Sequence, residues 1–131
     1  MNSPKFEVSV TPKFLPEQSD AAAGVYTFAY FVTIKNVGDI GAQLVARHWV
    51  IEDAKGNHQE VKGLGVVGQQ PLLQPGERFT YNSGTQIQSP VGSMHGTYIC
   101  IAEDTTVFEA QVPVFSLRAD SPEIPVTSML H

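Results

Sequence analysis

The chain has 131 residues, of which 42% are hydrophobic, so it is long enough for one globular domain with a buried core. Eight Lys and Arg residues against thirteen Asp and Glu residues give a net charge of -5, which argues against binding to nucleic acid, because phosphate backbones need dense positive surfaces. No apolar run approaches the roughly 18 residues of a membrane-spanning helix, so we expect a soluble protein without membrane insertion.

The N-terminal part of the chain predicts two β-strands joined by an exposed connection. Residues 5–11 alternate apolar and polar side chains between two prolines, which is typical of a half-buried strand. Residues 13–24 lose this alternation and are rich in turn-forming residues. Residues 25–37 give the strongest strand pattern, because aromatic and β-branched side chains suit a pleated sheet. One face of this strand carries Tyr26, Phe28, Tyr30, Val32 and Ile34.

Residues 42–53 predict a central strand that contains the chain's single tryptophan, Trp49. We predict that Trp49 points inward between two sheets, because its side chain has more apolar surface to bury than that of His48. This assignment also turns Arg47 inward, where its charge needs a carboxylate partner or a place near the rim. His48 then faces outward, and the opposite assignment would bring His48 into the core.

The second half of the chain predicts shorter strands with turn residues between them. A hairpin turn at residues 54–57 and a polar connection at residues 83–92 separate some of them. Pro113 cannot donate to a strand ladder, so it marks an edge strand or a bulge. The strands are predicted at residues 58–61, 78–82, 97–102 and 107–117.

About eight strands without a helical period indicate an all-β fold, an antiparallel β-sandwich of fibronectin type III or immunoglobulin-like type. A β-barrel is the alternative. We predict a single domain over residues 1–131, in which residues 118–131 form an extended C-terminal tail because prolines lie there among small polar residues.

The segment GLGVVG, residues 63–68, matches the GxGxxG pattern of phosphate-binding loops, in which closely approaching backbone amides bind phosphate. A dinucleotide-binding fold requires a helix directly after this motif, and no helical pattern follows it here. A glycine-rich turn can still form an anion-binding nest. We favour a structural turn and keep a pyrophosphate site as the alternative. The candidate ligand-binding or partner-binding residues are Gly63, Gly65, Gly68, Lys62, Arg47 and His48.

The remaining reactive side chains form no catalytic or metal-binding pattern. The four histidines lack the short spacings of zinc ligands. Cys100 lies in an apolar run without an activating base and cannot form an internal disulfide. The first residues lack the pattern of a signal peptide. We therefore expect a cytoplasmic, non-enzymatic protein with no catalytic residues, no cofactor and no metal site.

Several motifs in one order resemble the bacterial ApaG family, also named CorD. They are EQSD (17–20), YTFAYFVTIKNVG (26–38), ARHWVIEDAKG (46–56), EVKGLGVVGQQPLLQPGERFTYNSG (60–84) and GSMHGTY (92–98). The resemblance implies a fibronectin type III fold and an association with cobalt resistance and magnesium efflux. The genes of bacterial family members often neighbour a diadenosine tetraphosphate hydrolase gene, so the resemblance implies the same setting here. Similar domains in eukaryotic F-box proteins and in a polymerase delta interacting protein look like interaction modules.

Two functions from different classes follow. We expect a protein-protein interaction domain with an unidentified protein partner, whose effect on cation tolerance is indirect. The alternative is a small-ligand binder that holds a pyrophosphate-containing nucleotide at the glycine loop. Several cations that converge on the loop would favour the alternative, since Lys62 is adjacent in sequence and Arg47 and Arg78 could approach.

Overall fold

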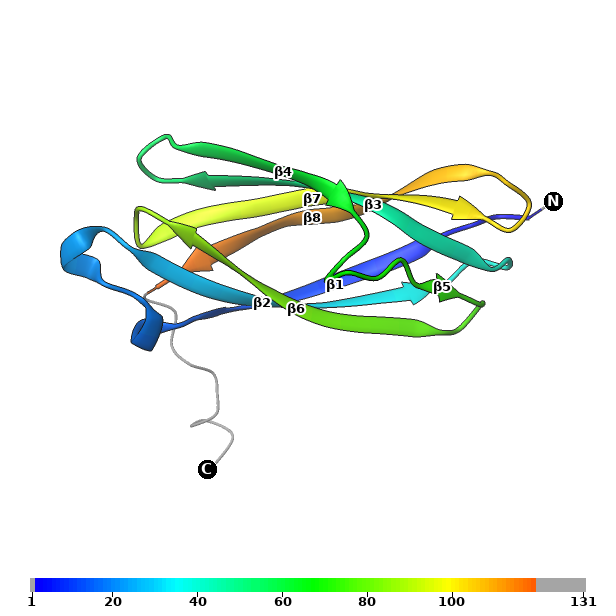
Figure 1. The fold of residues 1–131 in the computed structure, drawn as a ribbon, viewed down its shortest axis with the longest axis horizontal. Coiled ribbons are helices and arrows are strands. Elements are labelled where there is room, and N and C mark those ends of the chain that lie inside the picture. Colours follow the sequence, from blue (N-terminus) through cyan, green and yellow to red (C-terminus); the bar gives the residue numbers. More distant parts are fainter. Residues whose placement is uncertain (1, 120–131) are drawn as a thin grey trace, which may run out of the picture.

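The computed structural model describes residues 2–119, which form two antiparallel β-sheets packed face to face (Figure 1). One sheet has the strand order β1-β2-β6, and the other has the order β4-β3-β7-β8 with β5 also paired to β3. The predicted all-β sandwich is confirmed, and the described residues contain no α-helix. The strands are β1 (Phe6–Phe14), β2 (Tyr26–Asn36), β3 (Ala42–Asp53), β4 (His58–Leu64), β5 (Leu72–Leu73), β6 (Arg78–Ile87), β7 (Val91–Ala102) and β8 (Val107–Arg118).

Strand β3 begins and ends where the sequence pattern predicts, but β1, β4, β6, β7 and β8 are longer than predicted. Strand β1 continues to Phe14, whose ring packs 5.4 Å from that of Phe28. Strands β6 and β7 extend through most of the predicted polar connection at residues 83–92. These polar residues are extended because each lies opposite a residue of β2 or β3, as Ser83 lies opposite Tyr30. Pairing therefore overrides the local sequence preference.

Two 3₁₀ helices, η1 (Pro16–Gln18) and η2 (Ala21–Ala23), connect β1 to β2 in place of a plain exposed loop. The Thr27 hydroxyl ties this connection to β2 by donating to the carbonyl of Gln18 at 2.8 Å. At the other end of the chain, β8 extends to Arg118, and the rest of the predicted tail, from residue 120, lies outside the described residues. No helix within residues 2–119 has the length and apolar character needed to cross a membrane.

Trp49 fills the space between the two sheets, as predicted, and only 2% of its surface is exposed. Its ring centroid lies 5.4 Å from that of Tyr30 in the opposite sheet and 6.0 Å from that of Tyr98 in the same sheet. His48 is on the outer face of the five-stranded sheet and reaches Glu60 of the next strand. Tilted and edge-on ring pairs add to the apolar area that this cluster buries.

Pro113 lies at a bulge of an edge strand, so both structural possibilities raised by the sequence are present. Strand β8 is the last strand of its sheet. Its register with β7 shifts between Met94 and Gly96, which lie opposite Phe115 and Val112. The proline thus lies in the bulge, where β8 has one residue more than β7 and no ladder hydrogen bond is required.

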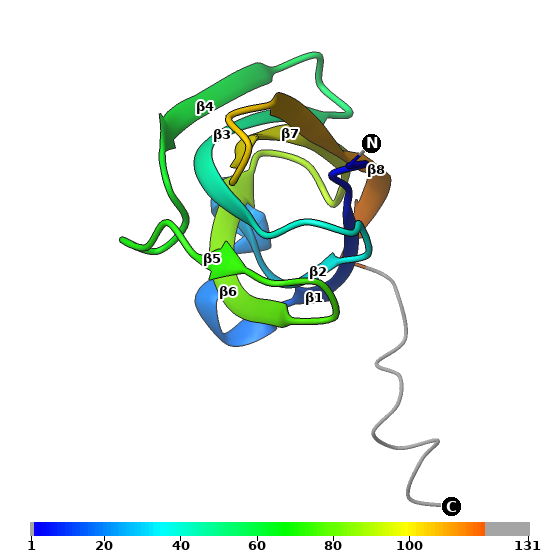
Figure 2. The ribbon, with the colours of Figure 1, turned by 90° about the vertical axis from the view of Figure 1, so that its right-hand side faces the viewer.

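The sandwich is closed on one side and open on the other. Strands β1 and β8 pack against each other along the closed side. Strands β4 and β6 end their respective sheets on the opposite side, where no pairing joins them (Figure 2). Two separate sheets with free edges distinguish this fold from the alternative β-barrel.

Candidate functional site

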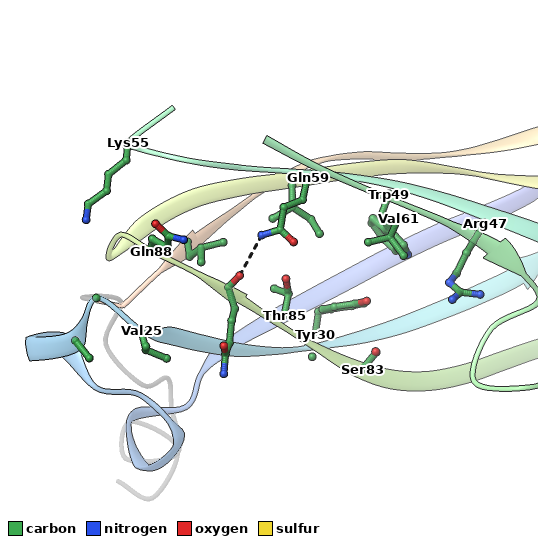
Figure 3. Close-up of a pocket in the computed structure, with 16 residues that line it drawn as sticks. Val25, Tyr30, Arg47, Trp49, Lys55, Gln59, Val61, Ser83, Thr85 and Gln88 are labelled. Atoms are coloured by element: carbon green, nitrogen blue, oxygen red, sulfur yellow. Dashed lines mark hydrogen bonds between the residues drawn. The ribbon is translucent and has the colours of Figure 1, made fainter. Parts of the chain in front are cut away.

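A groove with a volume of about 800 Å³ runs between the free edges of β4 and β6 (Figure 3). We call it the open-edge groove. Both sheets supply side chains to it, and its base reaches the aromatic core. It is lined chiefly by Tyr30, Arg47, Trp49, Lys55, Gln59, Val61 and residues 83–88.

Aromatic side chains form the base of the groove, and polar side chains lie nearer its opening. Tyr30 and Trp49 are core residues that reach the base of the groove, whereas Val61 is 38% exposed above them. The side-chain amide of Gln59 donates to the backbone carbonyl of Gln86 across the opening, at a long distance of 3.5 Å. The groove therefore combines apolar area at its base with hydrogen-bonding groups near its opening.

The backbone of β6 presents hydrogen-bonding groups without a partner strand on the side of the groove. Within an antiparallel strand, the N–H and C=O of one residue point to the same side, and successive residues alternate. The carbonyl of Glu77 accepts from Asn36 of β2, so odd-numbered residues of β6 face β2. The carbonyl of Gln86 faces Gln59 instead. The groups on the free edge therefore belong to Asn82, Gly84 and Gln86.

Arg47 lies at one end of the groove, near the rim of the sandwich. Its Nη1 donates to the backbone carbonyls of Leu64 at 3.1 Å and Gly65 at 2.9 Å. No carboxylate among residues 2–119 lies within ion-pair distance of its guanidinium. Of the two solutions expected for an inward arginine, the structure has the place near the rim, with carbonyls rather than a carboxylate as partners.

Gly63 makes room for this arginine. It lies within β4 opposite Arg47, and a Cβ at this position would be 2.9 Å from Nη1 of the guanidinium. A side chain here would push the guanidinium away from the two carbonyls. The first glycine of the GxGxxG pattern thus has a steric explanation that involves no ligand.

The other two glycines of the pattern shape the loop between β4 and β5. Gly65 and Gly68 have φ angles of 65° and 79°, a left-handed conformation that favours glycine. The backbone N–H groups of Gly65, Val66 and Gln69 donate to backbone carbonyls at 2.7 to 2.9 Å. These three amides serve the loop itself, so they are not directed at an anion.

A shallower pocket of about 390 Å³ on the outer side of the five-stranded sheet brings four of the six candidate residues together. They are Arg47, His48, Lys62 and Gly63. Glu60 places a carboxylate beside this pocket, since its Oε1 is 2.7 Å from Nε2 of His48. The hydrogen bond from His48 is the main reason that the pKa of Glu60 is below its ordinary value. Gly65 and Gly68 are not part of this pocket.

The described residues contain no group of three or more His, Cys, Asp or Glu side chains that could hold a metal ion. His48 and His58 flank Glu60, but the second contact is 3.7 Å long. Cys100 is fully buried, and this burial raises the pKa of its thiol to about 12. The thiol therefore stays protonated and is a poor nucleophile at neutral pH.

A pair of phenols between the two sheets escaped the sequence analysis. The hydroxyls of Tyr81 and Tyr98 are 2.5 Å apart and join the two sheets. Burial raises the pKa of Tyr81 to about 12 and raises that of Tyr98 further. The alternation within β6 and β7 places each side chain inward, but neither pattern alone shows that the two hydroxyls meet.

We expect alkaline pH to destabilise the protein through this pair. Because the folded-state pKa of Tyr81 is raised, the unfolded chain loses this proton first, and the free energy of unfolding falls as pH rises from about 10 to about 12. Urea unfolding across this range, with phenolate absorbance as a second signal, measures the effect. Tyr81→Phe should show a shallower decline. Equal pH dependence in the variant and the wild type would contradict this prediction.

The comparisons with known proteins agree with this fold. The ApaG domain family matches residues 16–102. The chain is 55% identical over 119 residues to Protein ApaG of Acidovorax sp. (strain JS42), covering 91% of this chain and 87% of that protein. It is also 55% identical over 118 residues to Protein ApaG of Dechloromonas aromatica (strain RCB), covering 90% and 93%. A Bordetella pertussis crystal structure, 50% identical, has a TM-score of 0.87 and covers 89% of this chain and 95% of that one. The chain belongs to the ApaG domain family.

Proposed function

We propose that this protein is a non-enzymatic protein-protein interaction domain that binds its partner in the open-edge groove. The observation that carries the proposal is the free edge of β6 beside a groove of about 800 Å³ whose base reaches Tyr30 and Trp49. Exposed strand edges are templates for pairing with another chain. An apolar interior beside such an edge adds the area that specific binding needs.

The chemistry of the groove supports binding rather than catalysis. Its lining contains arginine, lysine, amide, hydroxyl and apolar side chains, but no Asp, Glu, His or Cys. The usual general bases at neutral pH are His, Asp and Glu, and the hydroxyl and amine groups of the lining need such a base nearby to act as nucleophiles. The lining residues can therefore hold and orient a partner, and they offer no proton acceptor suited to neutral pH.

The geometry of the glycine loop does not favour the nucleotide alternative. Three of its amides are bonded to backbone carbonyls, and Gly63 faces the guanidinium of Arg47. The carboxylate of Glu60 beside His48 repels an anion at the outer pocket. A pyrophosphate site would need several donors that converge on one point.

The association of the family with cobalt resistance and magnesium efflux fits an indirect role in this proposal. The domain would act on cation tolerance through its protein partner, without holding the ion itself. The single buried thiol of Cys100 supports a reducing, cytoplasmic setting for that interaction.

Site-specific photo-crosslinking in native lysate tests the proposal with a matched pair of positions. Gln86 is an exposed glutamine in the groove, and Gln111 is an exposed glutamine of β8 on the outer face of the other sheet. A photoreactive residue at position 86 should capture a discrete partner, and the same residue at position 111 should not. A discrete partner captured only from position 111 would overturn the proposal.

A further inference from the structure

We infer that the open-edge groove takes an extended segment of the partner as an added strand on β6, and that Arg47 receives an acidic side chain of that segment. The inference rests on the proposed function and specifies its ligand. Three observations carry it: the composition of the two free edges, the size of the groove, and the charges at its ends.

The two free edges differ in a way that selects β6 as the pairing edge. Strand β4 carries His58, Glu60 and Lys62 along its exposed outer face. Charged side chains of this kind protect edge strands from pairing with other chains. Residues 83–87, the part of β6 that lines the groove, carry no charge. Gly84 also leaves the backbone there without a covering side chain.

The dimensions of the groove suit a short extended segment. At about 3.3 Å per residue, the lining residues 83–87 of β6 span roughly 16 Å, enough for about five residues of an added strand. Alternate residues of that strand would point into the groove toward Val61 and the base beside Trp49. The backbone of the segment would pair with Gly84 and Gln86, as in other complexes formed by strand addition.

The charges of the groove select an acidic segment. Arg47 lies at one end and Lys55 toward the other, as Figure 3 shows, and the lining contains no carboxylate. The Asp53 carboxylate accepts from the backbone N–H groups of Lys55 and Gln88 at that second end, so the positive charge without a nearby carboxylate lies at the Arg47 end, on a chain of net charge -5. Only Nη1 of the Arg47 guanidinium donates to the two loop carbonyls. Its other N–H groups can donate to a ligand. A carboxylate in an extended segment along β6 would provide the ion pair that Arg47 lacks among the described residues.

Selection from a phage-displayed library of random linear dodecapeptides against the full-length chain tests this inference. We expect enriched peptides to alternate apolar residues and to carry Asp or Glu at one fixed position. A synthetic peptide with an enriched sequence should lose about tenfold or more in affinity when that acid is replaced by its amide, as expected for a charge-assisted pair. N-methylation at alternate residues should also weaken binding, whereas N-methylation of the residues between them should not.

The acid-to-amide change in the peptide leaves the protein intact, so it tests the charge even if Arg47→Gln disturbs the loop. Where that variant folds, it should bind the acid and amide peptides equally. Groove binding without preference for an acid would overturn the inference and leave the proposed function standing. Thr85 lies on the inner face of β6 and lines the groove. Peptide binding that survives a groove-filling Thr85→Trp substitution would contradict both. Saturation of the groove by inorganic pyrophosphate, with no enriched peptide, would show that the occupant is a small anion and would also overturn both.

Discussion

Replacing Trp49 by alanine should lower the free energy of unfolding by about 3 to 5 kcal/mol, the range measured for large aromatic truncations in protein cores. Trp49 is 2% exposed and contacts rings from both sheets, so the truncation leaves a cavity that those rings cannot refill together. Equilibrium unfolding in urea, followed by circular dichroism, measures the change.

The neighbouring residue of the same strand gives a matched control. His48 lies on the outer face, and its main contact is with the exposed carboxylate of Glu60. His48→Ala should therefore cost less than about 1 kcal/mol, as surface substitutions usually do. If His48→Ala destabilised the protein more than Trp49→Ala, the assignment of the inner face of β3 would be wrong.

Gly65→Ala should destabilise the protein by roughly 2 to 4 kcal/mol, because two costs combine at this position. The residue has a φ of 65°, which an L side chain rarely adopts, and it is buried. A Cβ there would also overlap the backbone carbonyl of Gln69. That carbonyl accepts from the N–H of Val66, so it cannot move without loss of a loop hydrogen bond.

Gly68→Ala separates the two costs. Gly68 has a φ of 79°, but a Cβ there meets no atom within 4 Å, so only the backbone cost of about 1 to 2 kcal/mol remains. Both losses should be the same with and without ATP or diadenosine tetraphosphate. A saturable, salt-sensitive rise in Tm with either nucleotide that disappears in Gly65→Ala would show instead that the loop binds phosphate.

The sequence was sufficient for features that depend on alternation and side-chain size within one strand. The direction of Trp49 follows from its large apolar side chain on one of the two alternating faces of β3, and the bulge at Pro113 follows from its missing N–H. The same alternation places Arg47 inward. These are local properties, and the structure confirms each of them.

Features that depend on the order of strands could not be predicted in this way. The open-edge groove exists because β4 and β6 end different sheets on the same side, which no single segment encodes. The steric role of Gly63 depends on the side chain of Arg47 from the paired strand. The hydroxyl contact between Tyr81 and Tyr98 likewise requires two sheets in their final positions.

Amide hydrogen exchange tests most directly whether the free edge of β6 is the binding surface. In the free protein, the amides of Asn82, Gly84 and Gln86 should exchange quickly, because they have no partner strand, whereas those of Ser83 and Thr85 should be protected by β2. Binding of the partner captured through position 86 should protect the first three and leave the other two unchanged. Protection confined to the glycine loop or to the outer face of the five-stranded sheet would contradict the account.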